Sequence, residues 1–134
     1  MKTDEEAQAA IEQALHWYYF QGIYDGNVAL LEQVFHPKAL LFGDVNSQPY
    51  AKTLAEYLDG VAHRTSPNDS GKPYETEILR IDVINSIAVA KVRLKMYEFN
   101  YHDLLSFHKI EGKWLIVNKM LTHVGACSPV PATL

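Results

Sequence analysis

Apolar and polar residues alternate along the last third of the chain, from residue 74 to residue 124, as they do in strands with one buried face. Short polar breaks divide this region, and each carries an Asn or a Gly, residues that suit the positive φ of a two-residue hairpin turn. The turns are expected at Asn85-Ser86, Phe99-Asn100 and Glu111-Gly112. The pattern therefore predicts four antiparallel strands joined by three tight turns.

Two-residue turns also fix which residues face each other across neighbouring strands. They pair Val92 with Phe107, and Asp103 with Met120. Although the turns are identified separately, they bring one apolar set to a single face of the sheet, namely Leu79, Ile81, Val83, Ala88, Ala90, Val92, Leu94, Met96, Leu105, Phe107, Trp114, Ile116 and Met120. Three polar residues interrupt this face: Asp103, Asn118 and Lys109.

Asp103 is the interruption that bears on function. A carboxylate on a covered sheet face loses hydration worth several kcal/mol unless another group replaces it. Two interpretations stay open. In the first, Asp103 lies near a strand end and caps a backbone group or pairs with a nearby base. In the second, Asp103 and Asn118 form the polar floor of a ligand cavity with apolar walls.

The N-terminal half predicts the helices. Apolar residues recur at helical spacing from about residue 4 to residue 21, and a short helix is expected at 28–35. A short strand at 39–42 and a turn at 43–48 precede a helix that ends near residue 63, where Thr53 and Glu56 have the spacing of a capping box. Residues 64–73 read as a polar loop.

This order of elements predicts an α+β fold, in which a curved antiparallel sheet wraps around the N-terminal helices to form a cone, as in a cystatin-like α+β roll. With 134 residues and 48% hydrophobic content, the chain suits one domain, expected at 1–124, followed by an irregular tail at 125–134. If the helices do not fill the mouth of the cone, a pocket remains there.

Charge and composition narrow the partners. The net charge is −4, and the basic residues cluster only at Lys91, Arg93 and Lys95, so neither nucleic acid nor an anionic membrane is an expected partner. The sequence lacks a signal segment and a membrane span, which predicts a cytoplasmic protein. The single cysteine, Cys127, cannot form an internal disulfide.

Few residues suggest metal or cofactor chemistry. The six histidines are scattered without the spacing of a zinc site, and there is no phosphate-binding loop or dinucleotide fingerprint, so no metal and no cofactor is expected. His36, at a helix end, and His63, beside the polar loop, are the histidines expected nearest the cone mouth.

The opposite, convex face of the predicted sheet is also partly apolar. It carries Ile84, Ile87, Val89, Leu104, Leu115, Val117 and Leu121. Because every helix is needed on the concave side, a second subunit is the simplest cover for this face. The sequence therefore predicts a homodimer through the convex sheet face.

Two segments carry a resemblance to a known family. YFQGIYDGNVALLEQVFHPKALLFGD, at 19–44, and LLSFHKIEGKWLIVNK, at 104–119, resemble the nuclear transport factor 2-like superfamily. Within it the chain is most similar to the SnoaL-like and "putative lumazine-binding" branch. The resemblance spans about residues 5–124 and implies the α+β cone. It leaves the function open, because the superfamily includes isomerases, dehydratases, ligand binders and structural dimers.

Two positions can be carried over from that resemblance. Tyr19 falls where the ketosteroid isomerases of the superfamily have the tyrosine that hydrogen-bonds the substrate oxyanion. Gly43 falls where they have their catalytic carboxylate base, and a glycine cannot take a proton. The paired histidines of the scytalone-type dehydratases have no counterpart spacing either.

Three functions follow as alternatives. The first is a protein that binds a small organic molecule in an apolar cone pocket lined by Tyr19, Phe42, Tyr57, Met96, Asp103, Leu105, Trp114, Asn118 and Met120. The second is a lyase or isomerase that works by general acid–base catalysis, with Asp103, Tyr19 and His63 as candidate catalytic residues. The third is a non-catalytic structural dimer whose cone is filled by side chains.

Overall fold

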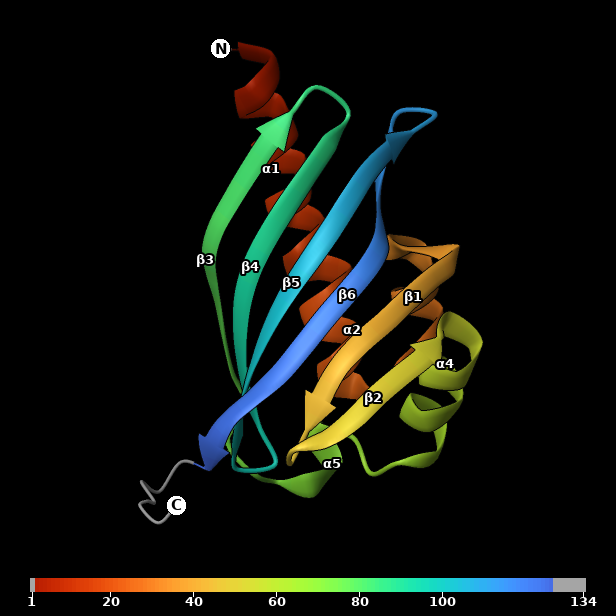
Figure 1. The fold of residues 1–134 in the computed structure, drawn as a ribbon, viewed down its shortest axis with the longest axis vertical. Helices are drawn as coiled ribbons and strands as arrows, with labels where there is room; N and C mark the ends of the chain where they lie inside the picture. The colour runs from red at the N-terminus through yellow and green to blue at the C-terminus, as the bar shows by residue number, and fades with distance from the viewer. Residues whose placement is uncertain (1, 127–134) are drawn as a thin grey trace.

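The computed structural model describes residues 2–126 of the chain. In chain order the elements are α1 (Lys2–Ala14), a π-helical segment η1 (Leu15–Phe20), α2 (Gln21–Asp25), α3 (Val28–Val34), β1 (Phe35–Val45), β2 (Gln48–Thr53), α4 (Leu54–His63), α5 (Pro67–Ser70), β3 (Glu75–Ile84), β4 (Ile87–Met96), β5 (Phe99–Ile110) and β6 (Lys113–Ala126) (Figure 1). Cys127 and the rest of the chain beyond it lie outside the described residues.

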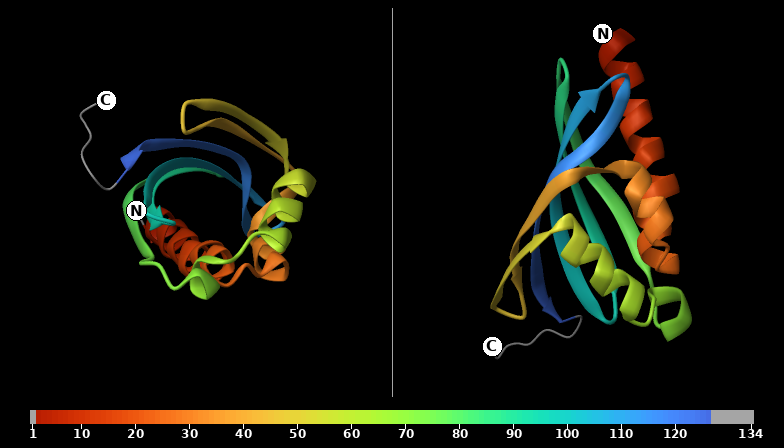
Figure 2. Two further views of the ribbon diagram at one scale, coloured as in Figure 1. Left: turned by 90° about the horizontal axis from the view of Figure 1, so that it is seen from below. Right: turned by 90° about the vertical axis from the view of Figure 1, so that its right-hand side faces the viewer.

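The strands form one six-stranded sheet in the order β2-β1-β6-β5-β4-β3. All neighbours are antiparallel except β1 and β6, which are parallel. Figure 2 shows the sheet curling around the N-terminal helices, with α4 beside β1 and β2. The predicted α+β cone is confirmed, with one parallel pair that the alternation of residues did not predict.

The helices form where their sequence signals indicate. The helix predicted at 4–21 continues to Asp25 and ends at Gly26, which has the positive φ of 64° that a glycine accepts readily. Asn27 caps α3 by accepting the N–H of Leu30. The predicted capping box of α4 is confirmed, because Thr53 and Glu56 each accept the other's backbone N–H.

The segment between β1 and β3 contains more structure than predicted. The strand predicted at 39–42 is the centre of the longer β1, and the predicted turn at 43–48 narrows to Asn46-Ser47, after which β2 pairs back along β1. The predicted polar loop at 64–73 contains the short helix α5, whose first turn Ser66 caps by accepting the N–H of Asp69. Both β2 and α5 consist mostly of polar residues, which is why the sequence predicted only a turn and a loop there.

Two of the three predicted turns are correct, and the third is displaced. The turns at Asn85-Ser86 and Glu111-Gly112 are confirmed, whereas the central turn lies at Tyr97-Glu98, with positive φ at both residues, rather than at Phe99-Asn100. The displacement moves the pairing between β4 and β5 by four residues. Because side chains alternate with a period of two, an even displacement keeps every residue on its predicted face.

A bulge in β6 has the opposite effect. The pairing follows the prediction from the turn as far as Phe107 and Ile116, then shifts by one residue between Ser106 and Phe107. From there Asp103 faces Leu121 instead of Met120. A one-residue slip turns each side chain to the other face. The prediction is therefore wrong for the end of β6, where Lys119 and Leu121 point inward and Met120 points outward. A second bulge, in β3, leaves Leu79 exposed.

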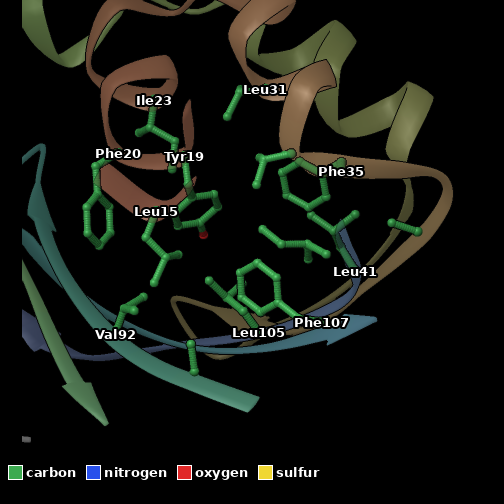
Figure 3. Close-up of a cluster of buried hydrophobic side chains, with 14 of the residues drawn as sticks. Leu15, Tyr19, Phe20, Ile23, Leu31, Phe35, Leu41, Val92, Leu105 and Phe107 are labelled. Atoms are coloured by element: carbon green, nitrogen blue, oxygen red, sulfur yellow. The ribbon is translucent and has the colours of Figure 1, made fainter. Parts of the chain in front are cut away.

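The core lies between the concave face of the sheet and the helices. It includes Ile11 and Ile116. Figure 3 labels further members of the core: Leu15, Tyr19, Phe20, Ile23, Leu31, Phe35, Leu41, Val92, Leu105 and Phe107. On the convex face, Ile84, Ile87, Val89, Leu104 and Met120 are exposed. Within the described residues, none of the helices has the length and apolar character needed to cross a membrane.

Candidate functional site

Asp103 lies in the middle of β5 and points to the concave face, where it is 2% exposed. Tyr19 donates a hydrogen bond of 2.5 Å from its hydroxyl to Oδ2 of Asp103. Tyr19 comes from η1 and is fully buried; Figure 3 shows its ring among the apolar side chains of the core. The structure thus brings together two of the three predicted catalytic candidates, which are 84 residues apart in the chain.

Tyr19 lies in the π-helical segment η1. Four consecutive aromatic residues, 17–20, lie in this segment, and their environments differ sharply. Trp17 is 61% exposed, whereas Tyr19 and Phe20 are buried. π-Helical segments are rare and occur frequently at functional sites.

Lys119 is the residue that sequence reasoning missed. The bulge in β6 turns its side chain inward, and it is 4% exposed. Its Nζ lies 3.9 Å from Oδ2 of Asp103 and donates a hydrogen bond of 3.4 Å to the hydroxyl of Tyr57. It also sits 4.5 Å from the centroid of the Tyr57 ring and 5.2 Å from that of Tyr19, which favours a cation through the ring faces. A buried ammonium therefore faces the carboxylate.

Burial controls the ionisation of this cluster. Burial raises the pKa of Asp103, although the Lys119 ammonium and the hydrogen bond from Tyr19 oppose the rise. Burial by itself lowers the pKa of Lys119, but Tyr57, Asp103 and Tyr50 outweigh it, so the pKa is raised and the ammonium is retained. Burial and the Asp103 charge raise the pKa of Tyr19 well above its ordinary value, so its hydroxyl keeps the proton that it donates.

One oxygen of the carboxylate is left free. Oδ1 of Asp103 is buried and has no hydrogen-bond partner among the described residues. The carboxylate borders a cavity of about 160 Å³ that is lined by Ile23, Val45, Tyr50, Tyr57, Arg64, Leu94, Met96, Tyr101, Asp103, Lys119 and Leu121. A buried polar atom without a partner, in a residue that lines a cavity, is an atom that a ligand can satisfy.

The other predicted site residues are distributed unevenly. Tyr57, Met96 and Asp103 line the cavity, and Tyr19 supports Asp103 from behind. Leu105 and Trp114 are buried in the core outside that lining. Three residues lie away from the cavity on or near the convex face: Phe42, Asn118 and Met120. Two of them, Asn118 and Met120, follow the bulge that reverses the faces of β6.

His63 does not join the cluster. Its side chain is 77% exposed at the end of α4, where Nδ1 lies 3.4 Å from the carboxylate of Asp59 in the same helix. Among the described residues, no three His, Cys, Asp or Glu side chains gather closely enough to hold a metal ion. The candidate chemistry therefore rests on Asp103, Tyr19, Lys119 and Tyr57.

Gly43 has a structural role at the edge of this region. Its φ is 155°, and a Cβ at this position would lie 1.8 Å from the carbonyl oxygen of Leu121 in the neighbouring strand. The parallel pairing of β1 with β6 brings the two backbones this close. No side chain fits here, so a carboxylate base cannot occupy this position.

The close approach at Gly43 gives a prediction for stability. Gly43→Ala is expected to lower the free energy of unfolding by about 3 kcal/mol, because the backbone contact cannot yield without separating β1 from β6. Gly60→Ala is the matched control: Gly60 lies in α4 with nothing within 4 Å of a new Cβ, and the change should stabilise by about 0.5–1 kcal/mol. Denaturant titration of both variants measures the difference. Equal stabilities would contradict the prediction.

Comparisons with known proteins agree with this fold. Residues 6–122 match the model of a family described as "Putative lumazine-binding". The chain is similar to solved structures of NTF2-like proteins of unknown function from Silicibacter pomeroyi (21% identity, TM-score 0.81, 90% of this chain and 98% of that one) and Shewanella baltica (23% identity, TM-score 0.79, 90% and 96%). The predicted match to the "putative lumazine-binding" family is confirmed, and the solved structures confirm the predicted nuclear transport factor 2-like fold.

A curated protein is also similar. It is the aldolase FrzH from Cladobotryum, which is 25% identical over 118 residues, 88% of this chain and 91% of FrzH. The two proteins therefore correspond over nearly their whole length.

Proposed function

The chain belongs to the family described as "Putative lumazine-binding", and from this premise we propose that it binds a small carbonyl compound in the cavity and catalyses proton transfer on it. The reaction class is that of a lyase or isomerase that forms an enolate next to the carbonyl. Asp103 is the general acid–base residue, and Lys119 with Tyr57 stabilises the developing oxyanion.

The free oxygen of Asp103 carries this proposal. Tyr19 holds Oδ2, so the carboxylate has a fixed orientation, while Oδ1 has no partner among the described residues and Asp103 is one of the residues that line the cavity. A general base needs an accepting atom within hydrogen-bond reach of the substrate proton, and its pKa should lie near the working pH. Burial raises the pKa of Asp103 in that direction. A purely structural carboxylate would have both oxygens satisfied.

The proposed step is balanced within the cluster. Oδ1 of Asp103 takes a proton from the carbon next to the carbonyl, and the electron pair of that C–H bond moves to the carbonyl oxygen. The resulting enolate oxygen faces the Lys119 ammonium and the Tyr57 hydroxyl, which lie 3.4 Å apart. Return of the proton to another carbon gives an isomerase. In a lyase, Asp103 instead takes the proton of a β-hydroxyl as the neighbouring C–C bond breaks.

Two further observations support this class. FrzH is named an aldolase, and aldol chemistry breaks or forms a C–C bond through an enolate, which favours the lyase. The cavity of about 160 Å³ is smaller than the pockets of roughly 300–1,000 Å³ that enclose drug-sized ligands, which favours a small metabolite. Charged side chains are costly to bury, so their presence beside this space argues against a cone that is only a filled structural module.

Hydrogen exchange tests the proposal directly. Acetone, cyclohexanone, pyruvate and levulinate are incubated with the protein in D₂O, and loss of the hydrogen next to the carbonyl is followed by proton NMR. We expect faster exchange of at least one compound than in buffer, and no acceleration by Asp103→Asn. Exchange at the buffer rate for all four compounds would reject the enzymatic function.

We also propose a homodimer through the convex face of the sheet. Phe42, Met120 and Leu104 are 43–50% exposed and lie side by side across β1, β6 and β5. Ile84, Ile87 and Val89 are exposed on the same face, and exposed apolar residues in such numbers mark interaction sites. A second copy related by a two-fold axis would present the same surface and cover both.

Light scattering at micromolar concentration should then give twice the chain mass. Leu104→Asp is expected to convert the dimer to a monomer, because an unpaired charge in an apolar interface costs several kcal/mol. Trp17→Asp is the control: Trp17 is an apolar residue on the helical side that is 61% exposed, against 43% for Leu104, and the variant should stay dimeric. A monomeric wild type would reject the proposed homodimer.

A further inference from the structure

Arg64 follows α4 and is held from two sides. Its backbone N–H donates to the carbonyl of Gly60 at 3.0 Å and closes the last turn of the helix. Its guanidinium lies 5.7 Å from the centroid of the Tyr97 ring in the turn between β4 and β5. The Tyr97 hydroxyl in turn donates a 2.5 Å hydrogen bond to the carbonyl of Thr65. These contacts tie the end of α4 to the β4–β5 turn and fix the guanidinium between them.

The polar edge of this guanidinium is unused. Nε and Nη2 of Arg64 are both buried and have no hydrogen-bond partner among the described residues. Arg64 is also one of the residues that line the cavity. Two adjacent N–H donors on one guanidinium form the fork that a carboxylate accepts with both oxygens. Leaving this fork buried and empty is costly, so a bound anion would satisfy it.

The charges around the cavity point the same way. Arg64 and Lys119 are cationic, and among the described residues of the lining Asp103 is the single carboxylate. Burial raises the pKa of Tyr50 and of Tyr101, so these two lining tyrosines stay neutral. The cavity therefore has an excess of positive charge and attracts an anion.

We propose that the substrate is a small oxo acid whose carboxylate binds side-on to Nε and Nη2 of Arg64 while its carbonyl faces Asp103 and Lys119. This inference rests on the proposed function for the position of the carbonyl. Arg64 is then the residue that sets specificity for acids over neutral ketones, and it takes no part in proton transfer. The lining tyrosines Tyr50, Tyr57 and Tyr101 provide walls for the carbon chain.

Matched pairs of probes test this assignment. Pyruvate, acetoacetate and levulinate differ in the distance between carboxylate and carbonyl, and each is compared with its methyl ester by isothermal titration calorimetry. At least one acid is expected to bind about 10- to 100-fold more tightly than its ester, the range for a charge-assisted bidentate contact. Arg64→Gln should remove the difference by weakening the acid alone. Arg64→Lys should keep part of it, since the charge remains but the fork is lost.

Controls separate this inference from the proposed function. Arg80→Gln removes an arginine that pairs with Asp82 on the surface, away from the cavity, and should leave acid binding unchanged. Asp103→Asn should abolish exchange yet keep the preference for acid over ester. Equal binding of acid and ester by the wild type, no acid binding at millimolar concentration, or a preference that survives in folded Arg64→Gln would each overturn the role of Arg64. Exchange could still occur in all three cases. Thermal melting establishes that Arg64→Gln is folded.

Discussion

Asp103→Asn is expected to slow protein-catalysed hydrogen exchange by about 10²- to 10⁴-fold at neutral pH, the range that a positioned general acid–base residue contributes. Asparagine keeps the volume of the side chain and an oxygen that can accept the hydrogen bond from Tyr19. It cannot accept a proton at the position of Oδ1, which is the oxygen of this cavity-lining residue that has no partner among the described residues. Proton NMR in D₂O measures the rate.

Asp44→Asn is the matched control for that substitution. Asp44 follows Gly43 in β1, is exposed, and accepts a hydrogen bond from the hydroxyl of Thr122 outside the cavity. Its exchange rate should equal that of the wild type. If Asp44→Asn lost most of its exchange activity while Asp103→Asn kept it, the base would be Asp44 and not Asp103, and the mechanism would be rejected.

The pH profile supplies an independent check of the same prediction. Burial raises the pKa of Asp103, so its basic form is depleted at a higher pH than in an ordinary aspartate. The exchange rate should fall as the pH drops through this raised value, with its midpoint above the ordinary value of about 3.9. A midpoint at or below that value would mean that a different group accepts the proton.

The fold could be predicted because its signals are local and redundant. The box formed by Thr53 and Glu56 marks the start of α4, and Glu111-Gly112 marks a hairpin turn. The misplaced turn at Phe99-Asn100 did not change which residues were predicted to face inward, since the true turn at Tyr97-Glu98 moves the register by an even number of residues. Alternation with a period of two therefore preserved the buried face from Ala88 to Phe107.

The site was harder to predict because it depends on an odd displacement. The one-residue shift between Ser106 and Phe107 places Lys119 and Leu121 on the inner face in place of Asn118 and Met120. Nothing in the run from Val117 to Leu121 marks this bulge, since apolar and polar residues suit either register there. The isolated Asp103 on an apolar face was the one local signal, and it identified the residue around which Lys119 and Tyr19 gather.

Arg64 shows a second limit of reading the sequence. It belongs to a stretch without periodicity, and the polar loop predicted there gave its side chain no direction. The orientation of the Arg64 side chain is set by contacts with residues far away in the sequence, above all Tyr97 in the β4–β5 turn. A cationic side chain becomes a candidate for ligand binding through such contacts and through burial of its donors, neither of which composition reveals.

Lys119→Met is expected to lower the free energy of unfolding by about 3–5 kcal/mol at neutral pH, the cost of removing one partner of a buried ion pair. The side chains of Lys119 and Asp103 are only 5% and 3% exposed, so solvent cannot replace the lost partner. Lys91→Met, which removes an exposed lysine, is the control and should change stability by less than about 0.5 kcal/mol. Urea titration gives both values.

The loss in Lys119→Met should also depend on pH with a definite sign. Lys119 lowers the pKa of Asp103, so without it that pKa rises further in the folded state while the unfolded value stays ordinary. The folded variant then binds more protons than the unfolded chain, and its stability increases as the pH falls through the raised folded pKa toward the unfolded value of about 3.9. The gap to the wild type should narrow over that range. A gap that widens in acid would exclude Asp103 as the partner.

A double variant identifies the origin of the cost. Asp103→Leu in the Lys119→Met background removes the stranded carboxylate and leaves an apolar pair of similar volume, a replacement that is often neutral or stabilising for buried ion pairs. The double variant should therefore recover most of the 3–5 kcal/mol lost by Lys119→Met, although it lacks both groups proposed for catalysis. If it stays as unstable as Lys119→Met, the lost energy comes from the contacts of the Lys119 ammonium with the Tyr57 and Tyr19 rings, and its pairing with Asp103 is not what stabilises the cluster.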